Sequence, residues 1–266
     1  MKAIKVLSVL LLIISIGIAG MYYTYDKMTR DTEAPVITCD KDEIKVSVKA
    51  GEETLLEGVT VKDNKTKDVQ KSLIIEKISN FTDANTRIIT YAAIDDSGNV
   101  GRCERTLVYE DYREPTFTLS RPLRFPVGST VNILGAVGAT SGLDGDLSDK
   151  VKYTLGTVIN ATAAGNYDVE YRVMDSVGKI SYLPLKIEIY DANRERIEVV
   201  LSEYLIYLPI NSSFDPNTYY VGSAIEGTLS VKSNVDTSKE GVYTVDYQVD
   251  GTNSIGKSRL VVVVTK

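Results

Sequence analysis

The sequence predicts an all-β protein in which three tandem sandwich domains follow one N-terminal transmembrane helix. Three observations lead to this fold class. One pattern recurs at a spacing of roughly 80 residues, short strands alternate with turn signals, and the chain begins with an apolar run. A period of that size is one small domain, so the repeat indicates the architecture before any single element is assigned.

The N-terminal run is apolar from Val6 to Tyr23 and follows Lys2 and Lys5. As a helix rising about 1.5 Å per residue it reaches roughly 27 Å, close to the thickness of a bilayer core of about 30 Å. We therefore predict that residues 1–25 form a short cytoplasmic stub and a signal anchor, with residues 6–23 in the membrane.

The two lysines favour the cytoplasmic side, which makes the protein single-pass with its C-terminal part extracellular, at the cell surface. The alternative is a cleaved signal peptide. Small residues at Gly17-Ile18-Ala19 suit cleavage, and loss of residues 1–19 would release a secreted protein. Tyr22, Tyr23 and Tyr25 favour the anchor, because they extend the run with an aromatic edge.

The composition excludes several classes of function. The chain has no His, which removes imidazole bases, Ser-His triads, papain-like dyads and most catalytic zinc sites. Its net charge of −6 argues against nucleic acid as a partner. The 17 Tyr, 4 Phe and abundant Val, Ile and Thr favour strands with one half-wet face.

Three segments follow the anchor, at 34–112, 115–190 and 192–266. Within them Ile44, Val46 and Val48 alternate with polar residues, the period-two pattern of a strand with one wet face. Short strands and regular turns over about 75 residues predict an Ig-like β-sandwich in each segment. The polar connections between segments are short, so we expect a stiff row of domains.

The repeated pattern is a strand that ends near a Tyr and runs into a Gly turn. In the second and third segments it reads Gly-x-Tyr-x-Val-x-Tyr, at 165–171 and 241–247. This strand resembles a tyrosine corner, in which a Tyr hydroxyl ties a neighbouring loop to the sheet. Arg87 replaces the first Tyr in the first segment, so any role of that position is not expected in all copies.

Longer stretches carry a resemblance to a known family: Phe214-Asp215-Pro216 with 234–247 in the third segment, Asp144-Gly145-Asp146-Leu147-Ser148 with 165–171 in the second, and 35–39, 58–63 and 91–99 in the first. They resemble bacterial Ig-like repeats of the pesticidal-crystal-protein type, with hyalin-repeat character in the first segment. The resemblance covers nearly the whole exterior. It implies Ig-like folds that serve as spacers, adhesion modules or accessory domains on bacterial surfaces.

Cys39 and Cys103 are both in the first segment. In an exterior compartment such a pair is most simply a disulfide, and the hyalin-type repeat is similar in carrying its own pair. A redox or metal pair is the alternative, but neither a CxxC spacing nor a His accompanies these residues.

A second candidate site is acidic. The sequence predicts no cofactor other than Ca²⁺, for which Asp144, Asp146 and Asp149 could supply hard oxygen ligands. The competing interpretation is a turn, because Asp-Gly favours turns and the run lacks the spacing and closing Glu of a calcium loop.

A third candidate is aromatic, in the segment farthest from the anchor along the chain. Its Tyr residues could contact a glycan or a surface protein, although most of them could equally be sheet packing: Tyr204, Tyr207, Tyr219 and Tyr220.

The function predicted from these features is noncatalytic: a bacterial cell-surface rod that presents a binding or adhesion surface or acts as a spacer. The alternative is a structural subunit of an envelope or secretion-type assembly, joined through sandwich edges or through its helix. An envelope enzyme is disfavoured because no domain remains unassigned after the repeats. The oligomeric state stays open.

Overall fold

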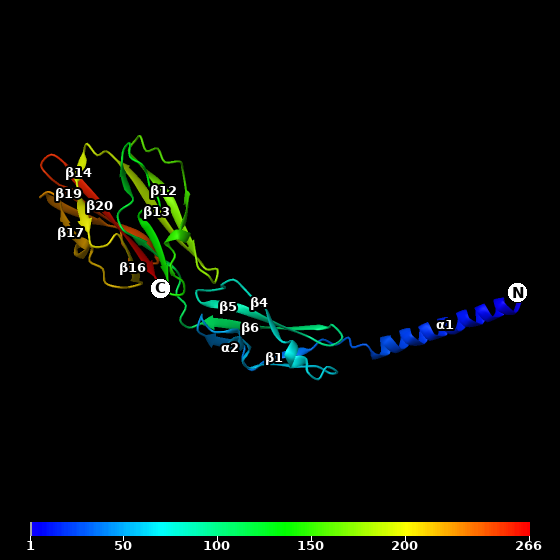
Figure 1. The fold of residues 1–266 in the computed structure, drawn as a ribbon. Helices are drawn as coiled ribbons and strands as arrows, with labels where there is room; N and C mark the ends of the chain where they lie inside the picture. The colour runs from blue at the N-terminus through cyan, green and yellow to red at the C-terminus, as the bar shows by residue number, and fades with distance from the viewer. Residues whose placement is uncertain (1) are drawn as a thin grey trace. The chain divides into compact units, whose positions relative to one another are not determined.

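The fold consists of an N-terminal helix followed by a series of β-sandwich domains, which confirms the predicted fold class. The computed structural model describes the backbone of residues 2–266 and the side chains of residues 7–28 and 30–266. Strands make up 45% of the chain and helices 15%. The chain divides into two compact units, 1–111 and 112–266, each described here by itself (Figure 1).

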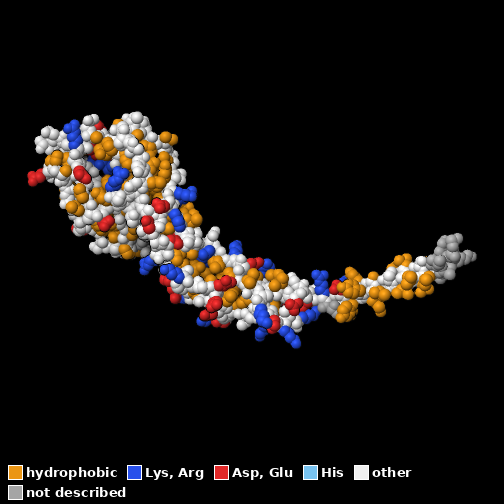
Figure 2. Space-filling view, in the orientation of Figure 1, with side chains coloured by type: hydrophobic (Ala, Val, Ile, Leu, Met, Phe, Trp, Pro, Cys, Tyr) orange, Lys and Arg blue, Asp and Glu red, His pale blue; other side chains and the backbone are white. Residues whose placement is uncertain are grey.

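Helix α1 spans Lys2–Thr29, beyond the predicted residue 23. Within it, Leu7–Met28 is long and apolar enough to cross a membrane, with a mean hydropathy of 2.0 and none of it buried inside the protein. Figure 2 shows hydrophobic side chains along this helix. The lysines at positions 2 and 5, on which the predicted orientation depends, have side chains outside the described residues.

The first sandwich packs a two-stranded sheet, β1-β3, against a four-stranded sheet in the order β2-β6-β5-β4. Strand β2 joins β6 in parallel, and the other pairs are antiparallel. Its elements are β1 (Val36–Cys39), β2 (Glu43–Val46), α2 (Glu52–Leu56), β3 (Val59–Lys62), η1 (Val69–Ser72), β4 (Ile74–Ile78), β5 (Thr86–Ile94) and β6 (Val100–Tyr109).

The second sandwich repeats this topology within residues 112–190. Sheet β10-β9-β7 faces sheet β11-β12-β13-β8, and β8 joins β13 in parallel as β2 joins β6. Its elements are β7 (Thr116–Leu119), β8 (Arg124–Pro126), β9 (Val137–Ser141), β10 (Gly145–Asp146), η2 (Ser148–Lys150), β11 (Lys152–Leu155), β12 (Gly165–Met174) and β13 (Ile180–Tyr190).

The third sandwich sets the pair β15-β17 against a sheet in the order β14-β20-β19-β18, with β16 also paired to β20. Its elements are β14 (Glu195–Ile197), β15 (Val199–Leu201), β16 (Leu205–Pro209), η3 (Pro216–Tyr219), β17 (Tyr220–Ser223), β18 (Thr228–Ser233), β19 (Gly241–Asp250) and β20 (Ile255–Thr265). The last strand is buried on both faces near its end, where Val261, Val262 and Val264 are all buried.

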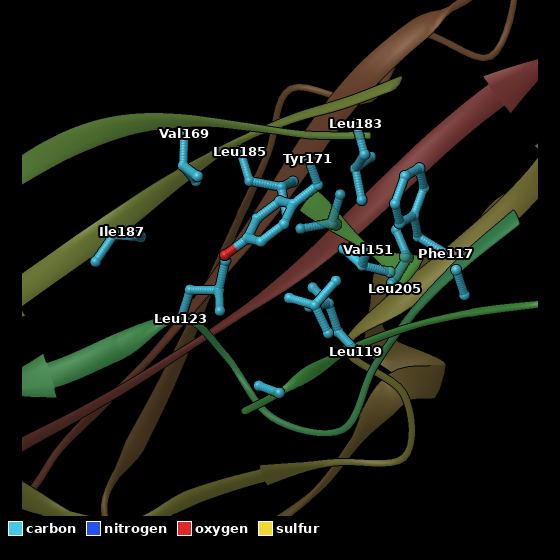
Figure 3. Packing of buried hydrophobic residues seen from close by; sticks show 14 of the residues in the cluster. Phe117, Leu119, Leu123, Val151, Val169, Tyr171, Leu183, Leu185, Ile187 and Leu205 are labelled. Atoms are coloured by element: carbon cyan, nitrogen blue, oxygen red, sulfur yellow. The ribbon is translucent and has the colours of Figure 1, made fainter. Parts of the chain in front are cut away.

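The second and third sandwiches share a hydrophobic core. Leu205 and Val261 of the third sandwich belong to the same buried cluster as Phe117 and Tyr171 of the second. Figure 3 shows Leu205 among the side chains of the second sandwich. Burial of apolar side chains contributes about 1.5–3 kcal/mol each, so this shared packing holds residues 112–266 together as one unit. The domain boundaries at 115–190 and 192–266 stay a prediction.

A buried Tyr at the same place in each sandwich explains the sequence repeat. Tyr91, Tyr171 and Tyr247 are fully buried on β5, β12 and β19. Each hydroxyl donates to a loop carbonyl, from Tyr91 to Leu55 at 2.7 Å, from Tyr171 to Ile133 at 2.8 Å and from Tyr247 to Pro216 at 2.6 Å. These bonds confirm the tyrosine corner in the second and third sandwiches and add the first.

Candidate functional site

The two cysteines lie side by side but are not bonded. Cys39 ends β1 and Cys103 lies in β6, and their Sγ atoms are 3.6 Å apart in free thiols. A disulfide requires about 2.05 Å, so the predicted disulfide is not supported by the structure. Burial, followed by the hydrogen bond with Cys103, raises the pKa of the Cys39 thiol to about 11. Because thiolate is the reactive form, this environment disfavours oxidation at neutral pH.

The four tyrosines predicted as ligand contacts do not gather on one exposed face. Tyr204 and Tyr207 pack against the shared core, and Tyr219 and Tyr220 against the core of the third sandwich. The Tyr207 hydroxyl accepts a hydrogen bond from the Phe117 amide at 2.8 Å. The geometry gives each ring a packing role, and ligand binding by them stays a prediction.

The acidic run of the second sandwich forms a turn around Gly145, whose φ of +75° suits glycine. Asp144 accepts a hydrogen bond from the Ser176 amide at 3.0 Å, and Asp146 from the Ser148 hydroxyl at 2.6 Å. These bonds lower the pKa of both carboxyls. The structure thus gives Asp144 and Asp146 separate partners and places exposed Asp149 in η2. Calcium binding by this run stays a prediction.

A different carboxylate group lies in the first sandwich. Asp31, Asp63 and Asp95 each place one oxygen within 4.8 Å of one oxygen from each of the others, and among the described residues no other such group of three is found. Asp31 precedes β1, Asp63 directly follows β3 and Asp95 directly follows β5. We call this group the acidic trio. Sequence reasoning missed it because 32 positions separate its neighbouring members.

A cleft opens where the second and third sandwiches meet. It has a volume of 470 Å³ and is lined by residues of β12, β13, β19 and β20 together with the loops at β7 and β8. Its lining is largely aliphatic, including Leu119, Leu123, Leu185, Val242 and Val261. A volume of this size falls within the range of small-ligand sites.

The charged groups at the edge of the cleft are already paired. Arg124 is 10% exposed and contacts Glu188 at 2.8 Å and also Glu195, while its Nη1 donates to the Lys257 carbonyl at 2.7 Å. Lys257 in turn contacts Glu195 at 3.0 Å. Burial acts to lower the pKa of Arg124, but the two carboxylates raise it overall, so the guanidinium stays charged.

Two further ion pairs flank the cleft, Lys186 with Asp168 at 2.8 Å and Arg259 with Asp246 at 2.6 Å. The cleft therefore combines a largely aliphatic lining with edges whose charges are neutralised by ion pairs. None of these charged groups is placed as a nucleophile with an adjacent base.

The comparisons with known proteins are limited in extent. No family model matches the chain. The chain is 30% identical over 159 residues to the pesticidal crystal protein Cry22Aa of Bacillus thuringiensis, which covers 54% of this chain and 21% of that protein. The chain therefore spans about a fifth of the length of this curated relative. The match is consistent with a β-rich protein of Ig-like type.

Three solved structures are similar in part. A structure of CBM51-2 in complex with GlcNAc and INT domains from Clostridium perfringens ZmpB is 16% identical, covers 57% of this chain and 42% of that chain, and has a TM-score of 0.31. Mouse cadherin-23 EC22-24 is 14% identical, with 87% of this chain and 99% of that chain covered and a TM-score of 0.24. The human desmocollin-1 ectodomain is 11% identical, with 88% of this chain and 62% of that chain covered and a TM-score of 0.21.

Proposed function

We propose that the chain is a noncatalytic, membrane-anchored surface protein that binds a protein partner through the cleft of residues 112–266. The observation that carries this proposal is a bare apolar helix of 22 residues on a chain whose β-sandwiches form a preshaped aliphatic cleft. A helix that is apolar all round and covered by no protein is suited to lipid. The sandwiches then act as a scaffold outside the membrane.

The lining of the cleft favours a protein over a glycan. Sugars are commonly held against aromatic faces, and the residues that line the 470 Å³ cleft include none. Aliphatic side chains such as Leu185 and Val242 instead suit the apolar side chain of a partner. The paired charges around the cleft leave no uncompensated charge to repel or to attract a strongly charged ligand.

Selection of displayed random peptides on the full-length protein in nonionic detergent tests the binding proposal. We expect enriched peptides that share an apolar residue, with binding lost in Thr244→Trp, which fills the cleft. The matched control is Thr228→Trp, because Thr228 is exposed on β18 and does not line the cleft. Equal peptide binding by the two variants would contradict a protein ligand in the cleft. So would binding to an oligosaccharide array that is lost in Thr244→Trp and kept in Thr228→Trp.

Membrane anchoring has its own test. The full chain should stay in the membrane fraction during alkaline carbonate extraction, whereas a chain lacking residues 1–29 should be soluble. Release of the full chain, or detection of a mature form that begins after residue 19, would support the cleaved signal peptide instead.

A further inference from the structure

Two carboxylates of the acidic trio are buried to a degree that carboxylates rarely tolerate without compensation, and the third, Asp63, is half-buried. Asp31 is 4% exposed and Asp95 is 6% exposed. Each of the three carboxylates has an oxygen within 4.8 Å of the other two. Like charges at this separation repel one another, and burial removes the water that would screen them. The trio therefore needs a source of positive charge or of hydrogen-bond donors.

The donors in the first sandwich serve only some of the oxygens. Asp95 Oδ1 accepts from the amides of Ser97 and Asn99, and its Oδ2 accepts from the Asn99 side chain. Burial acts to raise the pKa of Asp95, but these bonds hold it below its ordinary value, so this group is a carboxylate at neutral pH.

The other two carboxylates each keep one oxygen without a donor. Asp63 Oδ2 accepts from the amides of Lys65 and Thr66, and Asp31 Oδ1 accepts from the Glu33 amide. Asp31 Oδ2 and Asp63 Oδ1 are buried and have no hydrogen-bond partner. An unpaired buried carboxylate oxygen is destabilising, and here two of them belong to the same trio.

Lys65 lies within ion-pair distance of the trio but does not balance its charge. Lys65 Nζ lies 4.0 Å from Asp31 Oδ1, at the outer limit of an ion pair, and its side chain is 52% exposed. One half-exposed ammonium supplies a single positive charge against three carboxylates. Two negative charges remain, which equals the charge of one divalent cation.

The second sandwich shows how the same corner is completed without an ion. Asp175 follows β12 as Asp95 follows β5, and its Oδ1 accepts from the amides of Val177 and Lys179 in the same manner. There the Tyr112 hydroxyl donates to Asp175 Oδ2 at 2.6 Å. Ser141 occupies the position in the second sandwich that Asp63 occupies in the first. It directly follows Thr140, which pairs with Thr116 as Lys62 pairs with Val36.

We propose that Asp31, Asp63 and Asp95 bind one Ca²⁺ ion. Carboxylate oxygens are the hard ligands that Ca²⁺ prefers, and Ca²⁺ accepts six to eight oxygens in irregular geometry. Mg²⁺ is less suited, because it requires a near-ideal octahedron and gives up its water reluctantly. Since Asp31 lies between α1 and β1 in the chain, the ion ties the segment after the helix to the ends of β3 and β5.

Calcium titration of the full-length protein in nonionic detergent tests this proposal. After removal of divalent ions, calorimetry should give one site per chain, with a Kd of about 10⁻⁴–10⁻³ M as in extracellular modules. At a calcium concentration tenfold above the Kd, the melting temperature of the first sandwich should rise by about 5–10 °C. Mg²⁺ at the same concentration should have a smaller effect.

Three variants assign the response to residues. Asp63→Asn keeps the shape of the side chain and should weaken calcium binding at least tenfold. The matched control Asp175→Asn alters the equivalent corner of the second sandwich and should leave the affinity unchanged. Asp144→Asn tests the acidic run of the second sandwich and should also leave the affinity unchanged.

Asp31→Asn keeps the proposal testable if Asp63→Asn folds poorly. Without calcium this variant should melt at a higher temperature than the parent, because it removes one of the mutually repelling charges of the trio, and with calcium it should lose the stabilisation. The proposal is overturned if 10 mM CaCl₂ gives neither heat nor a melting shift, if Asp144→Asn abolishes binding while Asp63→Asn does not, or if KCl of equal ionic strength reproduces the shift.

Discussion

Asp95 and Asp175 occupy the same position in the first and second sandwiches, directly after β5 and β12, but different groups face them. Asp95 lies among two other carboxylates, whereas Asp175 accepts a hydrogen bond from the Tyr112 hydroxyl. The turn itself is the same, because each aspartate accepts hydrogen bonds from two backbone amides of the turn. The turn thus positions the aspartate in both sandwiches. The residues that face the carboxylate then determine whether protein donors satisfy it or whether, as we propose for Asp95, a cation is required.

The third sandwich closes this corner in yet another way. Gly251 follows β19 where the aspartates follow β5 and β12. A Cβ atom added there would lie 2.9 Å from Ile197 Cδ1 and 3.3 Å from the Ser254 carbonyl oxygen, so a side chain at this position would require its neighbours to shift. Residues 251–254 join β19 to β20, whereas five residues join β5 to β6 and β12 to β13, so the third sandwich uses a shorter turn that carries no aspartate.

The largest difference between the first two corners should come from removing their aspartates. Asp175→Ala leaves a buried tyrosine hydroxyl and two amides without their acceptor, and we expect a loss of about 3 kcal/mol in the free energy of unfolding. Asp95→Ala loses similar bonds but also relieves the repulsion with Asp31 and Asp63, so its cost in calcium-free buffer should be about 1 kcal/mol.

Urea unfolding followed by circular dichroism measures both costs, with limited proteolysis assigning each transition to a unit. Equal losses in the two variants would show that the repulsion among the three carboxylates is not felt in the folded protein.

Removal of the tyrosine hydroxyl should have a smaller effect. Tyr112→Phe keeps the ring and deletes only the donor to Asp175, which should lower the stability of residues 112–266 by about 1.5 kcal/mol. The calcium response should be unchanged, and the same urea experiment with and without CaCl₂ measures both quantities. A calcium response that disappears in Tyr112→Phe would place the ion in the second sandwich.

A buried tyrosine is common to all three sandwiches, so its titration at alkaline pH should affect them in the same way. Burial raises the pKa of Tyr247 to about 12, with Tyr219 and Asp215 as smaller contributions. Because the folded state favours the protonated phenol, its contribution is present below pH 10 and is lost as the pH rises to about 12. Melting curves between pH 8 and 12 should show this loss, and Tyr247→Phe should flatten it.

The smallest effect is expected at the cysteines. Free thiols that are not bonded contribute mainly by packing, so Cys103→Ser should cost less than about 1 kcal/mol. The raised pKa of Cys39 also predicts slow reaction with a thiol reagent at pH 7.5. A melting temperature that falls by more than about 10 °C in Cys103→Ser under oxidising conditions would instead indicate the disulfide that the sequence predicted.

The sequence was sufficient for the features that depend on local pattern. The sandwich strands and the buried Tyr171 and Tyr247 follow from period-two alternation and from a repeated motif. Arg87 was interpreted as a break in that motif, yet its Nε donates to the Ser79 carbonyl at 2.6 Å, as the Tyr167 hydroxyl donates to Asn160. The guanidinium and the phenol make the same contact from unrelated chemistry, which a pattern of residue types does not reveal.

The acidic trio and the cleft depend on tertiary contacts and were not predicted. Asp31, Asp63 and Asp95 lie far apart in the sequence, whereas Asp144 and Asp146 are clustered there and accept hydrogen bonds within and beside a turn. Calcium binding by Asp144 and Asp146 stays a prediction. Strand register brings the acidic trio together across long separations, and no local signal encodes it. The shared core around Leu205 was likewise not predicted, because the connection between the second and third segments is short and polar, as expected at a domain boundary.

Amide hydrogen exchange of the full-length protein, with and without calcium, tests the central claim most directly. We expect calcium to increase protection at residues 63–66 and 95–99 of the first sandwich and to leave residues 175–179 of the second unchanged. Equal protection of both corners, or no change at 63–66 and 95–99 at saturating calcium, would contradict it.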